Sequence, residues 1–105
     1  MLESSVPSKV EEQYNYPMSW VYIIKNKGNK IYVGVSDNPN SRLQYHNRRH
    51  GAQFTQNNPS FEIAFLEKYP DLSAARKREI QIKKWRREKK DNLIERYKNR
   101  LNTKI

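Results

Sequence analysis

The sequence predicts a small α/β (α+β) domain, in which a central three-stranded, largely antiparallel sheet is flanked by helices in the order β-β-α-β-α-α. Two short segments rich in β-branched and aromatic residues, 20–25 and 31–36, indicate two paired strands. Apolar residues spaced two apart over 61–65 indicate a third strand. Helix-start signals lie between the second and third strands and again after the third strand.

The first two strands are joined by the polar turn 26–29, whose central glycine is expected to take a positive φ and close a β-hairpin. Pairing Ile24 with Lys30 would place Tyr22 opposite Tyr32. Directly opposed residues share one face of a sheet, so we expect both phenols to point the same way.

Three helices follow from local signals. Residues 37–40 combine an Asx cap with a proline in the first turn, which predicts a helix running to about His50 and stopping at the next glycine. After the third strand, Ser73 is expected to cap a helix over 74–86, and a second helix is expected over 88–100.

A chain of 105 residues and 12.6 kDa has room for one domain with one modest core, because hydrophobic residues make up 35% and the mean hydropathy is -1.11. We expect a flexible polar arm at residues 1–18, a folded domain at 19–105 and an amide-rich loop at 52–60. The expected core residues are Trp20, Ile24, Ile31, Val33, Phe61, Ile63, Phe65, Leu93 and Ile94. Trp85 is expected to cap this core, with stacking on a nucleic acid base as the alternative.

The chain contains no cysteine, which excludes a disulfide scaffold, thiolate zinc fingers and cysteine nucleophiles. Its first 19 residues lack the apolar stretch of a secretory signal, and no segment is long and apolar enough to span a bilayer. We therefore expect a cytoplasmic protein without a membrane partner.

The charge is strongly basic: 21 Lys and Arg residues face 11 Asp and Glu residues, and 13 of the basic residues lie after residue 70. Concentrated positive charge attracts nucleic acid through counterion release. A solubilising surface or an anionic membrane would be the alternative, but the basic helices lack a broad apolar face to lie in lipid. The charge therefore indicates a nucleic acid partner, but charge alone does not distinguish DNA from RNA.

Particular residues on these elements resemble the GIY-YIG nuclease family. The segments Val21-Tyr22-Ile23 and Tyr32-Val33-Gly34, on successive strands, resemble the GIY and YIG motifs, although the first differs from the consensus. Arg42 and His46 follow on the next helix, and Glu79 on the helix after the third strand. The basic tract 78–85 is similar to that of the small stand-alone branch of the family. The resemblance covers about residues 20–95.

This resemblance implies a role for each residue in hydrolysing a phosphodiester bond with one metal ion. Tyr22 and Tyr32 would be the base that deprotonates water and its helper, in either order. Arg42 would contact the phosphate, Glu79 would hold a magnesium or manganese ion, and His46 would relay a proton or support the other groups.

The chemistry of these residue types agrees with the implied roles. A free tyrosine, with a pKa of about 10, is a poor base at neutral pH unless positive charge favours its ionised form. Arg42 and His46 are four residues apart, which places both on one side of their helix. Gly34 lets the strand backbone approach a phosphate or a neighbouring element. Magnesium keeps several waters and needs only one or two carboxylates, so Glu79 alone suffices.

Each residue also has a purely structural explanation. The two tyrosines are ordinary strand residues, and Glu79 is placed to pair with Lys83 one turn further on. However, Glu79 lies on the same helical face as Ala75 and Ile82, which is unusual for a solvated carboxylate. The joint occurrence of these residues in order favours the functional interpretation.

We expect a metal-dependent endonuclease that acts on DNA and recognises backbone and structure more than sequence. Either its own selectivity is weak or a partner protein directs it to its substrate. Gly34, Lys83, Lys84, Arg86 and Arg87 are the candidate nucleic-acid contacts. The alternatives are a non-catalytic nucleic-acid-binding module, or a ribonuclease or RNA-binding factor. Many family members carry a lysine after the second motif, where this chain has Val35, and Lys30 is the substitute available.

Overall fold

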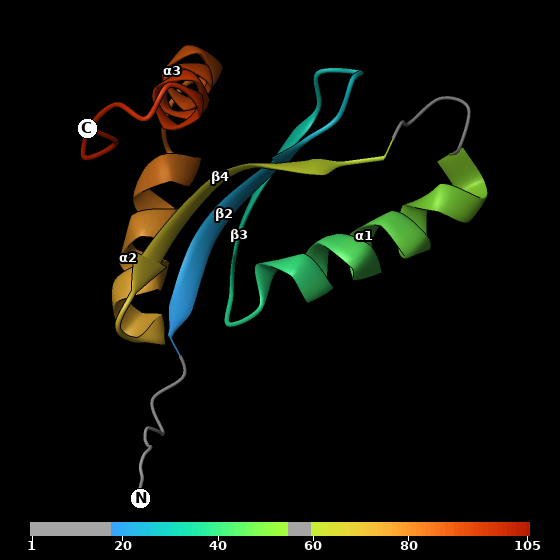
Figure 1. Cartoon of the computed structure of the whole chain (residues 1–105), viewed down its shortest axis with the longest axis horizontal. Helices are drawn as coiled ribbons and strands as arrows, with labels where there is room; N and C mark the ends of the chain where they lie inside the picture. The colour runs from blue at the N-terminus through green and yellow to red at the C-terminus, as the bar shows by residue number, and fades with distance from the viewer. Residues whose placement is uncertain (1–17, 55–59) are drawn as a thin grey trace, which may run out of the picture.

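The computed structural model describes residues 18–54 and 60–105, with the side chains of 49–54 left out. Apart from Met18, the arm expected at 1–18 therefore lies outside the described residues, as do residues 55–59. The elements are β2 (Ser19–Lys25), β3 (Ile31–Ser36), α1 (Pro39–Phe54), β4 (Glu62–Tyr69), α2 (Leu72–Lys83) and α3 (Arg87–Lys98). The strands form one sheet in the order β3-β2-β4 with both pairings antiparallel, which confirms the predicted fold class and element order (Figure 1).

The β2–β3 hairpin is present, but its register differs by two residues from the predicted one. Ile24 pairs with Tyr32 and Tyr22 pairs with Gly34, so the predicted pairing of Ile24 with Lys30 is wrong. A shift of two residues keeps every side chain on its face of the sheet. Tyr22 and Tyr32 therefore share a face as predicted, as diagonal neighbours.

The turn accounts for the shifted register. The Asn26 backbone N–H donates to the Lys30 carbonyl at 3.1 Å, and the Asn26 side-chain oxygen accepts from the Lys30 N–H at 3.0 Å. Lys30 is thus used in closing the turn. The left-handed residue is Asn29, with a φ of 69°, and not Gly28 as predicted. Asparagine tolerates that region better than most residues with a side chain.

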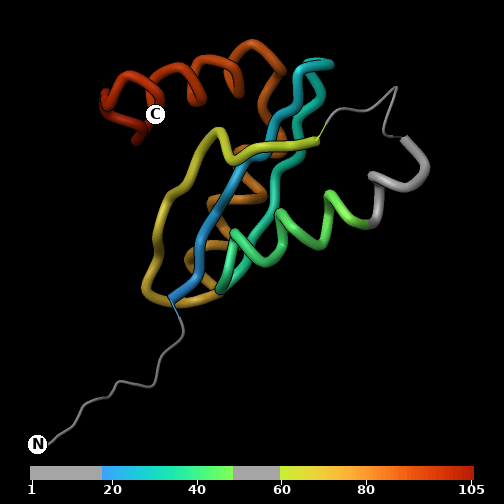
Figure 2. The backbone as a smooth tube through the Cα atoms, turned by 45° about the vertical axis from the view of Figure 1, so that its right-hand side comes forward, coloured from blue at the N-terminus to red at the C-terminus, as the bar shows by residue number. Residues whose placement is uncertain are grey.

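Both faces of the central strand β2 are covered, which explains its nearly continuous apolar sequence. Val21 and Ile23 point toward α2 and α3, whereas Tyr22 and Ile24 point toward the opposite face (Figures 1 and 2). The core on the α2 and α3 side consists of Val21, Ile23, Val33, Phe65, Ala75, Ile82, Leu93 and Ile94.

Five of the nine predicted core residues lie in this core or beside it: Ile31, Val33, Phe65, Leu93 and Ile94. Phe61 and Ile63 are partly buried and do not belong to it. Ile24 is buried on the opposite face, and Trp20 is only partly buried, with the Lys68 ammonium 5.7 Å from its ring centroid. Trp85 packs against the core between two cations, Arg78 at 5.3 Å and Lys89 at 4.3 Å from its ring centroid. Packing against the core is therefore the observed role of Trp85.

Several predicted helix boundaries are wrong. The first helix does not stop at Gly51, since α1 continues to Phe54. Asp71, and not Ser73, caps α2, because the Asp71 carboxylate accepts a hydrogen bond from the Ala74 N–H at 2.8 Å. As a result α2 begins two residues earlier than predicted and ends at Lys83.

A buried ion pair ties the end of the chain to β4 and α2. Arg78 Nε donates to Glu67 Oε1 at 2.8 Å, and both side chains are less than 9% exposed. Arg78 also donates to the main-chain oxygens of Thr103 at 2.8 Å and Ile105 at 3.1 Å. The Tyr69 hydroxyl donates to Glu67 Oε1 at 2.7 Å. All three nitrogens of the guanidinium group thus donate to an acceptor, which offsets the cost of burying its charge.

The surroundings of Glu67 change the pKa values of two groups. Burial is the largest effect on the Glu67 carboxyl and by itself raises its pKa. The Tyr69 hydrogen bond, the Arg78 guanidinium and the Lys104 ammonium together outweigh burial, so the pKa of Glu67 is lowered. Burial, followed by the neighbouring Glu67 carboxylate, raises the pKa of Tyr69. The ionised carboxylate and the protonated phenol are therefore the forms that the fold stabilises.

Candidate functional site

Tyr22 lies directly over Gly34 on the face of the sheet that α1 covers. A Cβ atom added to Gly34 would lie 2.5 Å from Tyr22 Cζ and closer still to the hydroxyl oxygen. Tyr22 is 5% exposed, so its ring has little room to move aside. Gly34 therefore leaves the space that the Tyr22 ring occupies. The sequence predicted that this glycine allows close approach of a phosphate or a neighbouring element, and the structure shows the approach of a neighbouring element.

Tyr32 and His46 form the centre of the same face. Their ring centroids are 5.3 Å apart with planes at 69°, and the His46 ring meets Phe61 edge-on at 4.6 Å. Tyr32 remains 50% exposed, whereas His46 is held between two aromatic rings. The structure therefore brings together on one surface residues that are far apart in the chain, from β3, α1 and the segment just before β4.

Asn47 holds α1 in this position. Its side-chain nitrogen donates to the Phe61 carbonyl at 3.1 Å, and its side-chain oxygen accepts from the Phe61 N–H at 2.9 Å. These two bonds join the middle of α1 to the beginning of β4, next to His46. Sequence reasoning missed both Asn47 and this use of Phe61, because an asparagine among basic residues carries no signal for so distant a contact.

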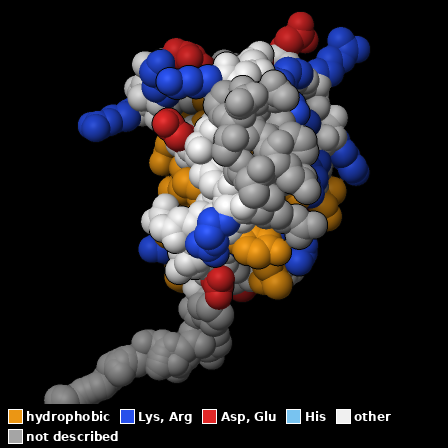
Figure 3. Space-filling model, turned by 90° about the vertical axis from the view of Figure 1, so that its right-hand side faces the viewer, with side chains coloured by type: hydrophobic (Ala, Val, Ile, Leu, Met, Phe, Trp, Pro, Cys, Tyr) orange, Lys and Arg blue, Asp and Glu red, His pale blue; other side chains and the backbone are white. Residues whose placement is uncertain are grey.

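Arg42 lies on α1 one turn before His46 and is exposed to solvent. Its guanidinium carbon is 5.6 Å from the ring centroid of Tyr45, which is itself 46% exposed. An exposed arginine beside exposed tyrosines has the properties of a surface for phosphates and bases. Figure 3 views the molecule from this side and shows Lys and Arg side chains, several Asp and Glu side chains and patches of hydrophobic side chains.

Glu79 is buried on α2, on the opposite side of the sheet from α1 (Figures 1 and 2). Its carboxylate pairs with Lys83 at 3.1 Å, as the spacing predicted, and with Arg76 at 3.7 Å. No hydrogen bond or ion pair within the described part of the chain joins it to the tyrosines or to Arg42.

Helix geometry shows the direction in which Glu79 leans. Consecutive helical residues are rotated by about 100°. Ala75 and Ile82 face the core, and Arg78 is turned to one side of that line, toward Glu67 on β4. Glu79 is therefore turned to the other side. Because the sheet order is β3-β2-β4, that side is the edge formed by β3, the strand that carries Tyr32 and Gly34.

The four basic residues expected to contact nucleic acid differ in their surroundings. Lys84 and Arg86 are exposed where α2 ends and α3 begins, and Lys83 is engaged with Glu79. Arg87 donates to Asp91 at 2.9 Å and to the Asn29 carbonyl at 2.7 Å, which ties α3 to the hairpin turn. Arg87 thus has a structural role, whereas Lys84 and Arg86 present their charge to solvent.

Over residues 18–92 the chain matches the GIY-YIG catalytic domain family. This match spans more than half of the chain, and the protein belongs to the GIY-YIG family, a family with a nuclease fold.

Within this family, the chain is similar to small stand-alone proteins. The UPF0213 proteins of Staphylococcus aureus strains Mu3, Mu50 and N315 are each 37% identical to it over 75 residues, which is 71% of this chain and 92% of theirs. The solution NMR structure of the UPF0213 protein BH0048 from Bacillus halodurans matches with a TM-score of 0.49 and 26% identity, over 74% of this chain and 83% of that one. Among the described residues, no helix combines the length and apolar character needed to cross a membrane.

Proposed function

We propose that this protein is a metal-dependent endonuclease that hydrolyses phosphodiester bonds in DNA and recognises backbone and structure more than sequence. The observation that carries the proposal is that Tyr22, Tyr32 and His46 gather on one surface, one helical turn from the exposed Arg42. We call this surface the tyrosine surface. Membership of a family with a nuclease fold supports phosphodiester hydrolysis as the reaction.

The two tyrosines differ in exposure, which assigns them different roles in the proposal. Tyr32 is half exposed and can accept a proton from a water molecule at the surface. Tyr22 is buried over Gly34 and acts as its helper, fixed in place by the close contact. As Tyr32 takes a proton from water, its own hydroxyl proton passes to His46, whose ring is held against the Tyr32 ring.

Arg42 binds the phosphate in this proposal. Its guanidinium group is charged at every physiological pH and offers paired donors that match phosphate oxygens. Because it lies one turn from His46 on the same side of α1, a phosphate bound to Arg42 would lie beside the tyrosine surface. Charge that develops on the phosphate during hydrolysis is stabilised there.

Glu79 is the residue that would hold the metal ion. It supplies a single buried carboxylate that leans toward the β3 edge, and magnesium accepts one carboxylate with water as its other ligands. Lys83 and Arg76, which pair with this carboxylate, have side chains 53% and 61% exposed and so have room to move away. A magnesium or manganese ion bound there would supply positive charge to the phosphate and the leaving oxygen.

The test is cleavage of labelled branched, nicked, single-stranded and duplex DNA with magnesium or manganese. Arg42→Ala and Glu79→Gln are expected to abolish metal-dependent cutting while salt-sensitive binding persists. The matched controls are Arg48→Ala, an exposed arginine on α1, and Glu88→Gln, an exposed glutamate on α3, and both should cut as wild type does. Cutting that survives Arg42→Ala, or that needs no metal, would contradict the proposal.

A nucleic-acid-binding module without catalysis is the second candidate. The observation that favours it is the pairing of Glu79 with two cations of its own helix. If this candidate is correct, wild type will bind DNA or RNA in a salt-dependent way but will cut none of these substrates with either metal. Matched RNA substrates then separate a ribonuclease from a binding factor. A cytoplasmic location and a partner protein that targets the catalytic unit, residues 19–105, belong to the same proposal.

A further inference from the structure

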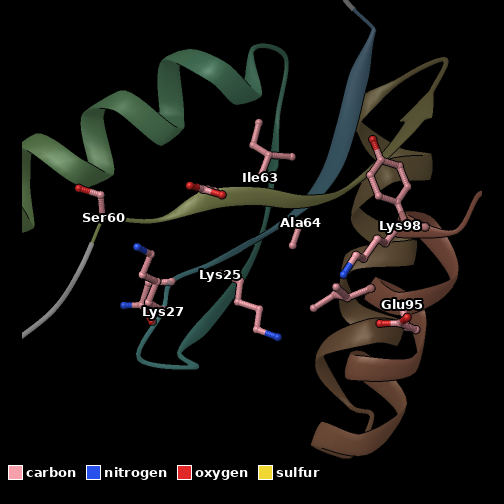
Figure 4. Close-up of a pocket in the computed structure, with 11 residues that line it drawn as sticks. Lys25, Lys27, Ser60, Ile63, Ala64, Glu95 and Lys98 are labelled. Carbon is pink, nitrogen blue, oxygen red and sulfur yellow. The ribbon is translucent and has the colours of Figure 1, made fainter.

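A groove lies between the hairpin turn, the start of β4 and α3 (Figure 4). Its volume is about 740 Å³. Its wall combines lysines, glutamates, apolar side chains and one tyrosine. The lining residues are Lys25, Asn26, Lys27, Ser60, Glu62, Ile63, Ala64, Ile94, Glu95, Tyr97 and Lys98.

Three lysines from three different elements meet at this groove. Lys25 ends β2, Lys27 lies in the turn and Lys98 ends α3 (Figure 4). Within the described part of the chain, none of the three forms an ion pair. Of the two groove glutamates, Glu95 accepts a hydrogen bond from the Asn99 side chain at 2.9 Å. The groove therefore offers more cationic than anionic groups to a ligand.

The groove also has an apolar floor and a fixed aromatic ring. Ala64 and Ile94 provide the floor. The Tyr97 ring meets Phe65 edge-on at a centroid distance of 5.5 Å, yet Tyr97 remains 38% exposed. An aromatic ring that is fixed by one neighbour and remains partly exposed can stack with the flat face of a nucleic acid base.

We infer that this groove binds an unpaired nucleic acid strand, with its phosphates on Lys25, Lys27 and Lys98 and a base against Tyr97. Only an unpaired strand exposes the faces of its bases, because a duplex keeps them stacked inside. An acidic peptide would use the lysines but would have no use for a tyrosine placed to stack. Binding in the groove needs no metal and no tyrosine chemistry, so the inference goes beyond the proposed cleavage and does not depend on it.

The groove opens next to the tyrosine surface. Ser60 and Glu62 line the groove, and Phe61, between them in the chain, packs against His46 on the other surface. The start of β4 is therefore the place where a bound strand would pass from the tyrosine surface to the groove. The groove would hold the single-stranded part of a substrate that has both paired and unpaired regions.

Salt-dependent binding of a short, labelled oligothymidylate tests this inference, measured by fluorescence anisotropy in EDTA so that no cutting occurs. Each phosphate contact adds about 0.7 to the slope of log affinity against log salt concentration for a single strand. Lys27→Gln/Lys98→Gln removes two of these contacts and is expected to lower the slope by about 1.4. The control Lys68→Gln/Lys77→Gln removes the same charge from exposed lysines outside the groove and should leave the slope unchanged.

Crosslinking provides a second measurement that does not depend on the charge of the variants. An oligothymidylate that carries 5-iodouracil, irradiated with wild-type protein, is expected to attach to Tyr97. An equal change of slope in both double variants, or crosslinks confined to Tyr32 and Tyr45, would overturn the inference. So would a polyglutamate peptide that binds more tightly than the oligonucleotide and loses this binding in Lys27→Gln/Lys98→Gln, because the occupant would then be an acidic protein.

Discussion

At the scale of single residues, Gly34 shows most clearly how the sequence constrains the site. The Tyr22 ring occupies the space that any side chain at position 34 would need. The glycine is therefore required by a contact between neighbouring strands, and the shifted register creates that contact by placing Tyr22 opposite Gly34.

Gly34→Ala is expected to destabilise the protein by about 1–3 kcal/mol, the usual cost of inserting a methyl group where there is no room. It should also displace Tyr22 and so reduce cleavage. Thermal unfolding and cleavage of the preferred substrate would be measured together. Gly28→Ala is the control, because Gly28 has no positive φ and lies in an exposed turn. Equal melting temperatures for wild type and Gly34→Ala would show that Tyr22 is not held as described.

The candidate site could be predicted from sequence only where residue type and order were sufficient. Two tyrosines ten residues apart on paired strands share a face under either register, so the gathering of Tyr22 with Tyr32 followed from the period of the strand. The contribution of Asn47 did not follow, because its hydrogen bonds reach across 14 residues to Phe61. Local patterns carry no information about such a contact.

At the scale of elements, the buried pair between Glu67 on β4 and Arg78 on α2 joins the sheet to the C-terminal segment. In the sequence, Arg78 is simply the first residue of the basic tract 78–85. Its burial could not be predicted, because burial of an arginine depends on a carboxylate 11 residues earlier and on carbonyl groups near the end of the chain. The same reasoning separates Arg78 from its exposed neighbours Arg76 and Lys77.

The pH dependence of stability is expected to report on this pair. Because the pKa of Glu67 is lowered in the folded state, the stability it contributes is fully present above its ordinary value of 4.5. That contribution is lost as the pH falls through the lowered pKa. Glu67→Gln leaves Arg78 buried without its counter-charge, which costs about 3–5 kcal/mol near neutral pH.

Urea unfolding at neutral and acidic pH would measure this effect. The difference in unfolding free energy between wild type and Glu67→Gln should shrink as the pH is lowered below 4.5, because Glu67 of the wild type becomes protonated. Glu62→Gln, which changes an exposed glutamate on the same strand, should show only a small difference. A gap between wild type and Glu67→Gln that stays constant with pH would contradict the assigned charge of Glu67.

Boundaries of elements were harder to predict than their existence. Asp71 and Ser73 are both good helix caps, and the choice of Asp71 follows from the hydrogen bond its carboxylate accepts from the Ala74 N–H. Likewise, the turn closed by Asn26 takes Lys30 out of the strand and so moves the register. In both places the sequence offers two local solutions, and a local hydrogen bond shows which one the chain adopts.

At the scale of the whole molecule, the sheet divides two kinds of surface. On one side, α2 and α3 cover the core, and the groove lined by Lys25, Lys27 and Lys98 lies beside α3. On the other side, α1 carries Arg42 and His46 beside the tyrosines. Glu79 belongs to the core side but leans toward the β3 edge, where the two surfaces meet. The proposed catalytic surface and the inferred strand-binding groove thus lie on different sides of one small sheet.

The most direct test of the central claim is single-turnover cleavage by Tyr32→Phe, with magnesium and the preferred DNA substrate. Removing only the hydroxyl should lower the rate by about 10²–10⁴-fold, the usual contribution of a general base, while binding is unchanged. Tyr45→Phe removes the hydroxyl of another exposed tyrosine on the same side and should cut at the wild-type rate. A wild-type rate for Tyr32→Phe would contradict the assignment of the tyrosine surface as the catalytic site.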